Sequence, residues 1–500
     1  MRKELSLVKS LALTFLFAGI VLFGILHHEI WLDEAHHWLL ARDSNSLGDL
    51  IHNCRYEGHP MLWNFMLYGL AQFTANPLAM QLLNMILVIV AVFLFLRYSP
   101  FSVLQKILFI CSYFILFEYS VIARNYGLVF LALTLVALVY EKRESKFLLF
   151  AFLLLLLSQT HLIAAILATG IFALTSYEFK MQKHFPPKYY IGLALFIISL
   201  ALVCWQSIPP KNHFIYTFNS DGFLSLKRIA KGMTGMWKGL LPVPAFTSDY
   251  PWNSNLLINN SRLIGAIPAV VGWIIPFFVL GRDKKMILLF YGCAAAIATF
   301  LYLSPLVLSV RYCGFYFLLL LFCLWISEKR MKYKLSRQLL YFILICQLSG
   351  SVFLLYTDYK RPFSNGKAVA EWIKTNVDPK ATVMVSDHFS GPAISAYLGK
   401  KLFYPENDSL ESFCLWNTKP FIISREELLV KVWAQLKKTS SDHLWLVSDK
   451  ELKDFPFEKY PGIEKFNMEL VTQFRDAMVM TENYWIYKIS KRWEDQHVIF

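Results

Sequence analysis

Charged residues are few in this sequence. Asp, Glu, Lys and Arg together make up 17% of its 500 residues, whereas hydrophobic residues make up 56%, and the mean hydropathy is +0.45. A chain this apolar has too little polar surface to fold as a soluble domain of this length. The sequence therefore predicts a polytopic α-helical membrane protein.

Acidic residues are the rarer kind of charge, with 35 Asp and Glu against 49 Lys and Arg and a net charge of +14. A basic surplus can indicate a nucleic-acid partner when it is gathered on one surface. Here the cations stand in short clusters between apolar runs, which is the pattern that orients a membrane protein. We therefore expect membrane lipids as neighbours and no nucleic acid.

Several other features are missing from the chain. Its 8 cysteines have no metal-ligand spacing, and only Cys54 and Cys414 stand outside apolar runs where an oxidising compartment could reach them. The sequence does not decide whether these two pair. It contains no internal repeat or low-complexity tract, and no signal peptidase site follows the first apolar run, so we expect that run to remain as an anchor.

Apolar runs define the membrane topology. A helix needs roughly 20 apolar residues to cross the hydrocarbon core, and about eleven segments qualify by this measure. They lie near residues 10–27, 78–96, 102–117, 125–140, 147–160, 162–177, 189–207, 262–280, 286–303, 312–327 and 338–356.

Basic clusters fill alternate connections between these segments. The positive-inside rule then places the N-terminus in the cytoplasm, and we expect the protein in the cell (inner) membrane. The clusters are Arg2, Lys3 and Lys9; Arg97 and Lys106; Lys142, Arg143 and Lys146; Lys180, Lys183 and Lys188; Arg282, Lys284 and Lys285; and Lys329, Arg330, Lys332, Lys334 and Arg337.

The moderately apolar stretch from Met61 to Thr74 has to lie along the outer surface as a juxtamembrane helix, because a crossing there would invert every later segment. Residues 1–356 then form the membrane domain, with outer loops at 28–77 and 208–261. In the second loop, apolar residues from Phe223 to Leu240 recur at helical spacing among Lys and Arg. This predicts an amphipathic helix that either covers a lipid-facing surface or binds an anionic lipid head group.

Residues 357–500 have the pattern of an extracytoplasmic α/β domain. The periodicity predicts helices over 365–376, 391–398 and about 424–438, where Ser424 and Glu427 form a capping box. It predicts strands over 382–386, 402–404 and 443–447, with further short strands near Leu470 and Tyr484.

The first outer loop carries the acids most suited to chemistry. Asp33 and Glu34 stand in Trp31-Leu-Asp-Glu-Ala-His-His-Trp38, directly after the first apolar run. Either carboxylate could accept a hydroxyl proton as a general base, although acidic pairs also flank many helix starts. Glu57 and His59, in Glu57-Gly-His-Pro60, add a third carboxylate and an imidazole to the same loop.

Two arginines lie at the outer ends of apolar segments. Arg124 precedes Tyr126 by two residues, and Arg311 is followed by Tyr312. One such arginine is usually an interface anchor, but two of them on the side of the acids suggest a phosphate site, because a guanidinium offers a planar fork of donors. His161 follows Thr160 on this side and could bind substrate, although a buried histidine bonded to a carbonyl is the plainer interpretation.

Together these motifs resemble the membrane glycosyltransferases of the GT-C superfamily, in particular the bacterial branch related to protein O-mannosyltransferases and aminoarabinose transferases. The resemblance covers roughly residues 1–330 and includes the topology of about eleven transmembrane helices. It implies a sugar donor linked to polyisoprenyl phosphate and transfer to a glycan, lipid or protein acceptor on the extracytoplasmic side.

The resemblance also implies roles for residues. Asp33 matches the acid used as base or acceptor-binding group, with Glu34 beside it and Glu57 as a second acid, while Arg124 and Arg311 match positions associated with the lipid phosphate. At Gly58-His-Pro-Met61 the sequence departs from relatives that have two prolines followed by Leu-Tyr, so the shape of the acceptor groove does not carry over. No site residue carries over to 357–500.

The expected reaction is displacement at the anomeric carbon with Asp33 as base, and by analogy with glycosidases it would invert that centre. A divalent metal bridging Asp33, Glu57 and phosphate is left open. Two other functions remain as alternatives: a transporter or flippase for a lipid-linked or anionic substrate, and a noncatalytic assembly subunit. The transporter predicts ionisable groups near the middle of the bilayer and an inverted repeat.

Overall fold

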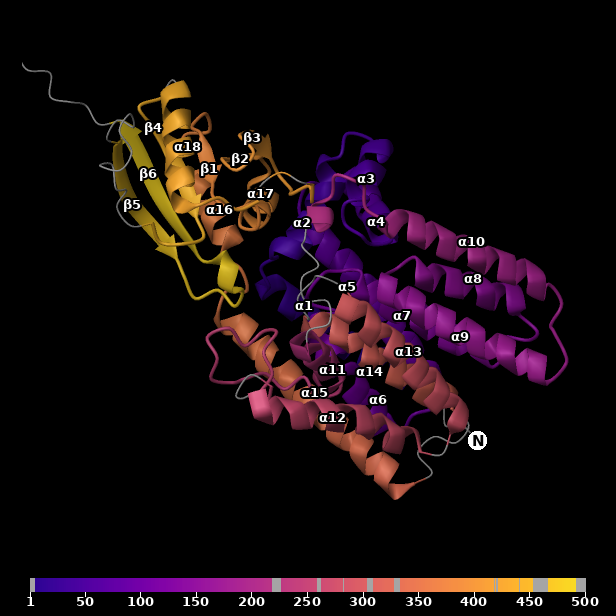
Figure 1. Ribbon diagram of the computed structural model, residues 1–500. Coiled ribbons are helices and arrows are strands. Elements are labelled where there is room, and N and C mark those ends of the chain that lie inside the picture. Colours follow the sequence, from indigo (N-terminus) through magenta and orange to yellow (C-terminus); the bar gives the residue numbers. More distant parts are fainter. Residues whose placement is uncertain are drawn as a thin grey trace, which may run out of the picture.

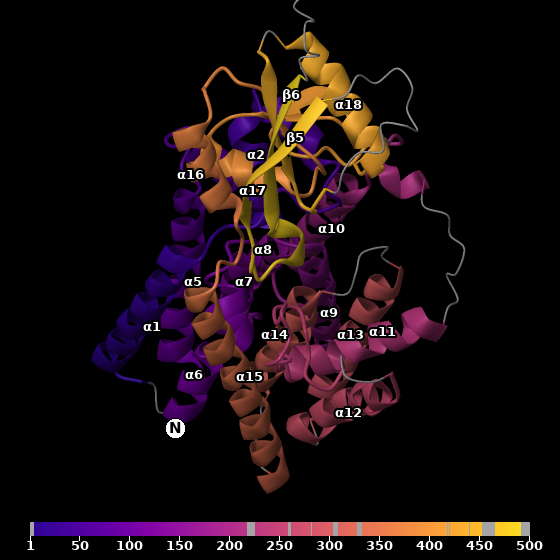
Figure 2. The same cartoon turned by 90° about the vertical axis from the view of Figure 1, so that its left-hand side faces the viewer.

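The structure is a computed structural model that describes residues 5–217, 226–258, 262–281, 283–303, 309–327, 333–417, 419, 421–439, 441–452 and 466–491. A helical part comes first in the chain, and the α/β domain lies at one end of it (Figures 1 and 2). Several residues named above lie outside the described ranges. These are Arg2, Lys3, Phe223, Arg282, Lys329, Arg330 and Lys332.

All the predicted apolar segments are helical. In the described residues, α1, α5, α9, α10, α13 and α15 are long and apolar enough to cross a membrane, and α7, α8, α14 and the Ile267–Leu280 part of α12 are shorter. The chain is therefore a polytopic α-helical membrane protein, as predicted. The helices are α1 (Leu7–His27), α5 (Leu78–Tyr98), α6 (Val103–Ile110), α7 (Tyr126–Tyr140), α8 (Phe147–Ser158), α9 (Leu162–Met181), α10 (Tyr189–Ser207), α12 (Arg262–Leu280), α13 (Lys284–Leu303), α14 (Val310–Ile326) and α15 (Lys334–Lys360).

One predicted segment, 102–117, is interrupted. The helix α6 ends at Ile110, and a π-helix, η1 (Tyr113–Glu118), follows it. The buried carboxylate of Glu118 accepts hydrogen bonds from Tyr113 Oη at 2.8 Å and from Trp252 Nε1 at 3.0 Å. The carboxylate at the end of η1 thus has two hydrogen-bond donors inside the protein. Short π-helical turns are frequent at functional sites.

The first outer loop folds into three short helices. They are α2 (Leu32–Asp43), α3 (Leu47–Cys54) and α4 (Leu62–Ala71). The 10 residues of α4 rise about 15 Å, which is half the thickness of the hydrocarbon core. By length, α4 is therefore too short to cross the bilayer, and its place along the membrane surface stays a prediction.

The amphipathic stretch forms α11 (Leu226–Leu240), which follows the short 3-10 helix η2 (Phe214–Thr217). Its second half is packed inside the helical part, because Met236 and Leu240 are fully buried and a Cβ on Gly239 would stand 2.2 Å from the carbonyl oxygen of Cys313. This half is a core element against α14, so neither of the two surface roles predicted for the stretch describes it.

The α/β domain contains a six-stranded sheet in the order β3-β2-β1-β4-β6-β5. β1 is parallel to β2 and β4, and the other pairs are antiparallel. The apolar side chains of α16 and α17 cover one face and those of α18 cover the other. The elements are α16 (Gly366–Asn376), β1 (Val383–Val385), α17 (Gly391–Leu398), β2 (Leu402–Tyr404), β3 (Ser409–Glu411), α18 (Arg425–Lys438), β4 (His443–Ser448), β5 (Phe466–Phe474), the 3-10 helix η4 (Met480–Glu482) and β6 (Tyr484–Lys491).

The elements predicted for residues after 357 are confirmed, and β3 is an addition to them. The boundary with the helical part is placed slightly later than expected, because α15 continues to Lys360. Ser424 caps α18 by accepting a hydrogen bond from the backbone N–H of Glu427 at 3.1 Å.

Candidate functional site

Asp33 and the two predicted arginines meet in the structure. Asp33 Oδ2 lies 3.2 Å from Arg124 Nη1 and also forms an ion pair with Arg311 Nη1. Burial alone would raise the pKa of Asp33, but Arg311 and Arg124 outweigh burial and hold the pKa below its ordinary value. Three segments that are far apart in sequence therefore form one charged cluster, which we call the clamp (Asp33, Arg124 and Arg311).

Each arginine of the clamp is also held independently of the Asp33 carboxylate. Arg124, two residues before the start of α7, donates from Nη1 to the backbone oxygen of Asp33 at 2.9 Å. The guanidinium of Arg311 lies over two aromatic rings, 5.1 Å from the centroid of Trp31 and 5.2 Å from that of Tyr312. Both cations lie at the starts of helices, Arg124 two residues before α7 and Arg311 at the second residue of α14.

The second outer loop contributes residues that the sequence did not single out. Trp252 packs on Trp31 with ring centroids 4.7 Å apart. Asn253 accepts hydrogen bonds on Oδ1 from Ser309 Oγ at 2.8 Å and from the backbone N–H of Val310 at 3.1 Å. Asn253 thus satisfies the N-terminus of α14 from a distant segment and fixes the turn that carries Arg311.

Glu34 is placed differently from Asp33. Its side chain is fully buried and accepts hydrogen bonds from the backbone N–H of Ala123 at 2.6 Å and from His28 Nε2 at 3.0 Å. His28 also contacts Asp358 of α15 through Nδ1 at 2.8 Å. Glu34 therefore ties α2 to α1, α15 and the segment before Arg124, and it faces away from solvent.

The α/β domain holds the start of α2 in place. The backbone N–H of Ile30 donates to Tyr397 Oη at 2.8 Å, and that of Leu32 donates to Glu482 Oε1 at 2.7 Å. Burial raises the pKa of Glu482 to about 8, so this carboxyl is mostly protonated at neutral pH. Two side chains of the domain thus fix the backbone on either side of Trp31, immediately before Asp33.

Glu57 lies with the histidines of α2. Its Oε1 is 2.8 Å from His36 Nε2, and its Oε2 is 4.0 Å from His37 Nε2. The ring of His36 in turn contacts Trp416 of the α/β domain, with centroids 5.7 Å apart. The sequence motifs around residues 33 and 57 therefore meet through an acid and two imidazoles, and His36 and His37 are site residues that the sequence motifs did not indicate.

Aromatic and imidazole groups lie beside the clamp. The ring of His161 is 5.1 Å from His59, 5.6 Å from Tyr126 and 6.0 Å from Tyr312. His161 caps α9 by accepting on Nδ1 from the backbone N–H of Ile163 at 3.0 Å, so it is bonded to an N–H and not to a carbonyl as the plainer interpretation held. This bond assigns the ring proton to Nε2.

The same region holds polar atoms without partners. Among the described residues, Tyr126 Oη, His161 Nε2, His59 Nδ1 and the Nε atoms of Arg124 and Arg311 are buried and make no hydrogen bond. Burial and Arg124 lower the pKa of His59 to about 4, so its ring is neutral at physiological pH. A site with several unsatisfied donors and two guanidinium groups can hold a phosphate and the hydroxyls of a sugar.

The residues proposed for a metal do not fit one. The described part of the chain has no group of three or more His, Cys, Asp or Glu side chains placed to hold a metal ion. Asp33 faces arginines and Glu57 faces histidines. We therefore derive no step through a metal.

All 8 cysteines are free thiols, and Cys54 and Cys414 are both buried.

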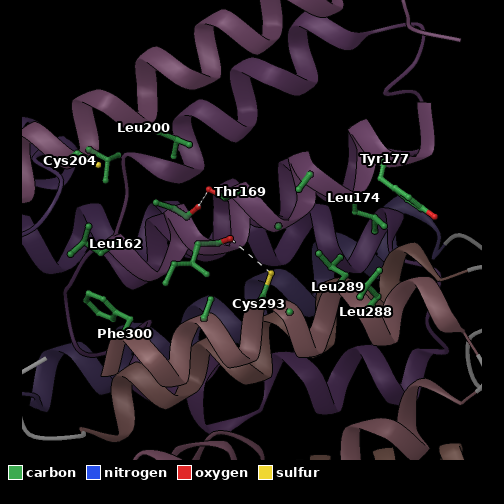
Figure 3. Close-up of a pocket in the computed structure, with 17 residues that line it drawn as sticks. Leu162, Thr169, Leu174, Tyr177, Leu200, Cys204, Leu288, Leu289, Cys293 and Phe300 are labelled. Carbon is green, nitrogen blue, oxygen red and sulfur yellow. Dashed lines mark hydrogen bonds between the residues drawn. The ribbon is translucent and has the colours of Figure 1, made fainter. Parts of the chain in front are cut away.

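An apolar cavity of about 790 Å³ runs along α9 between α10 and α13. Figure 3 shows its labelled side chains, from Leu162 and Phe300 at one end to Leu174 and Tyr177 at the other. We call it the groove. Leu162, at one end of the groove, directly follows His161 in the sequence. The length of α9 along it, from residue 162 to 177, corresponds to about 22 Å of helix.

Comparison with known proteins gives a distant structural similarity. No protein-family model matches the sequence, and no curated protein matches it. Among solved structures, the chain is similar to ArnT from Cupriavidus metallidurans bound to undecaprenyl phosphate, with 12% sequence identity, a TM-score of 0.45 and coverage of 96% of this chain and 97% of that chain. At this identity and TM-score, the similarity assigns no role to any residue.

Proposed function

We propose that the protein is an integral membrane glycosyltransferase that moves a sugar from a polyisoprenyl-phosphate-linked donor to an acceptor hydroxyl. The observation that carries the proposal is the clamp: one carboxylate and two arginines converge at the ends of helices, beside unsatisfied donors. An apolar groove begins at Leu162, the residue after His161. A donor that joins a phosphate to a long hydrocarbon chain would match both features, the phosphate at the arginines and the hydrocarbon chain in the groove.

The arginines would bind the phosphate of the donor. Guanidinium groups bind phosphate oxygens through paired hydrogen bonds, and these bonds strengthen as negative charge develops on the departing phosphate. Because phosphate is already a good leaving group, the reaction needs no second carboxyl as a general acid. Asp33 would accept the proton of the acceptor hydroxyl while that oxygen attacks the anomeric carbon from the opposite side, which inverts the centre.

The groove would hold the isoprenoid chain. Its lining is almost entirely apolar, and it begins at the residue after His161. A chain anchored there by its phosphate would extend along α9 and exchange bilayer contacts for protein contacts. The polar groups of Tyr126, His59 and His161 would then face the sugar, and Glu57 with His36 would face the acceptor.

A transporter or flippase is the second candidate. That function needs ionisable groups along a path through the bilayer, whereas Asp33 is the second residue of α2, Arg311 is the second residue of α14, and Arg124 stands two residues before α7. By the positive-inside rule, this end of the helical part is extracytoplasmic. The charged groups therefore favour chemistry at a surface over passage across the membrane.

The test uses purified full-length protein in proteoliposomes that contain polyisoprenyl-phosphate sugars. We expect sugar to appear on an added hydroxyl acceptor, with inverted configuration, and free polyisoprenyl phosphate to form in equal amount. Movement of the lipid-linked sugar between leaflets without any transfer would contradict the proposal and establish the transporter. Mass spectrometry of surface glycans and lipids from cells with and without the protein then identifies the sugar and the acceptor.

A further inference from the structure

The clamp has a property that phosphate binding alone does not explain. Both cations that would receive the phosphate are already paired with the same oxygen, Asp33 Oδ2. A carboxylate in this position is a poor base, because the arginines hold the pKa of Asp33 low. In the free protein, Asp33 is therefore a weak proton acceptor, and the two arginines are already occupied by its carboxylate.

We propose that Asp33 occupies the phosphate position in the absence of donor, and that the donor phosphate replaces it and frees the carboxylate to act as the base. This inference rests on the proposed function. The exchange is between two anions on one pair of cations, and no covalent bond changes. In the following step the freed carboxylate takes the acceptor proton, and the phosphate leaves with the electrons of the glycosidic bond.

The surroundings of the clamp allow the arginines to stay while the carboxylate leaves. Arg124 keeps its hydrogen bond to the backbone oxygen of Asp33, and Arg311 keeps its contacts with the rings of Trp31 and Tyr312. Neither anchor involves the carboxylate. The cations would therefore present the same spacing to a phosphate that they now present to Asp33.

The backbone of α2 is fixed, so only the Asp33 side chain has to move. Glu34 holds the backbone of Ala123, and Glu482 holds the backbone N–H of Leu32, so the residues on both sides of Asp33 are tied down. The side chain of Asp33 is 23% exposed, against 7% for Arg124 and 14% for Arg311. It is the most accessible member of the clamp and turns about only two side-chain torsions.

The exchange makes the base available only when donor is bound. A freed carboxylate next to a bound phosphate no longer has the full attraction of the two guanidinium groups, so its proton affinity rises towards that of an ordinary Asp. Without donor, water and acceptor hydroxyls meet a carboxylate that is paired with arginines and is therefore a poor proton acceptor. The arrangement therefore couples binding of the donor to activation of the acceptor.

The experiment measures binding of a water-soluble prenyl monophosphate to purified full-length protein by titration calorimetry. Asp33→Asn keeps the size of the side chain but removes the competing anion. We expect it to bind the phosphate about tenfold or more tightly than wild type, because ligand binding no longer has to break two ion pairs. Asp43→Asn, at the other end of α2, removes one negative charge outside the clamp and should leave the affinity within about twofold.

The outcomes separate the inference from the proposed function. Equal or weaker binding by Asp33→Asn, with clear binding by wild type, overturns the exchange and leaves the phosphate site in place. Absence of binding in wild type and in both variants overturns the phosphate site itself. Should Asp33→Asn fail to fold, Asp33→Ser provides the same comparison, since it also removes the anion and leaves space for the ligand.

Discussion

At the scale of single residues, the site depends on two neighbouring acids with opposite environments. Asp33 is partly exposed and faces two arginines, while Glu34 is fully buried and bonded to His28 and to the backbone of Ala123. Adjacent positions on a helix point about 100° apart, so one side chain reaches the site and the other the interior. The pair thus combines a side chain that belongs to the clamp with one that holds α2 in place.

The consequence for Asp33 is direct. Asp33→Asn removes the base while keeping the volume, so we expect kcat for sugar transfer to fall by about 100-fold or more with little change in thermal unfolding. The measurement is transfer by purified protein at saturating donor, with Asp43→Asn as the matched control. Turnover by Asp33→Asn at the wild-type rate would remove Asp33 from the chemistry.

At the scale of elements, the second outer loop sets the position of α14. Asn253 has a positive φ of 63°, a conformation that Asn tolerates better than most residues. From this position its Oδ1 satisfies the first backbone N–H of α14, at Val310. The loop thereby acts on Arg311, which follows Val310 directly.

Removing this cap should weaken donor binding. Asn253→Ala loses the acceptor and strains the backbone, so we expect a loss of about 0.5–2 kcal/mol of stability and a raised KM for the donor. Asn253→Asp keeps an acceptor oxygen and tolerates the same φ, and it should stay close to wild type. A donor KM for Asn253→Ala equal to that of wild type would show that the cap does not position Arg311.

The groove on α9 makes a second prediction at this scale. A Cβ on Gly292 of α13 meets nothing within 4 Å, and Gly292 lines the groove. Gly292→Phe should therefore fill the groove without displacing the backbone, and we expect the KM for long-chain donors to rise about tenfold while a short-chain donor is used normally.

The matched control is Gly19→Phe on α1, where a Cβ also meets nothing within 4 Å and the position lies away from the groove. It should use both donors as wild type does. An equal effect of Gly292→Phe on long-chain and short-chain donors would place the isoprenoid chain elsewhere.

Elements were predictable from the sequence where local pattern decides them. The span 262–280 agrees with α12, and Leu402–Tyr404 agrees with β2, because apolar period and length are local properties. The break before η1 was not predictable from local pattern. The buried carboxyl of Glu118 in η1 is bonded both to nearby Tyr113 and to Trp252, which is 134 residues away. The sequence also did not indicate that Glu34 would be buried and Asp33 paired, as both depend on segments brought together by folding.

At the scale of the whole molecule, the α/β domain holds the start of α2 in place. Sequence motifs assigned it no role, yet Tyr397 and Glu482 hold the backbone of residues 30 and 32. The protonated carboxyl of Glu482 accepts the first backbone N–H of α2. The domain that follows the membrane part in sequence therefore fixes the helix that carries Asp33.

The buried carboxyl of Glu482 should make the free energy of unfolding depend on pH. Burial raises the pKa of Glu482 from 4.5 to about 8, so the folded state holds a proton that the unfolded state releases. The free energy of unfolding should then fall as pH rises from about 4.5 to about 8, because the folded state binds more protons over this range. Glu482→Gln keeps the acceptor oxygen and removes the titration, so it should be more stable than wild type at pH 8 to 9.

Thermal unfolding of the purified protein across this pH range provides the measurement. Glu469→Gln, on an exposed position of β5, is the control and should follow wild type. Identical pH profiles for wild type and Glu482→Gln would mean that Glu482 does not carry a buried proton in the folded protein.

The central claim, that Arg124 and Arg311 bind the phosphate of a lipid-linked sugar, is tested most directly by sugar transfer with each arginine replaced by lysine. Lysine keeps the positive charge that membrane insertion uses but loses the planar fork of donors. With purified protein and polyisoprenyl-phosphate sugars, at matched expression, we expect each variant to raise the donor KM or to slow transfer by about tenfold or more. Wild-type rates and donor dependence in both lysine variants would contradict the account and leave the arginines as interface anchors.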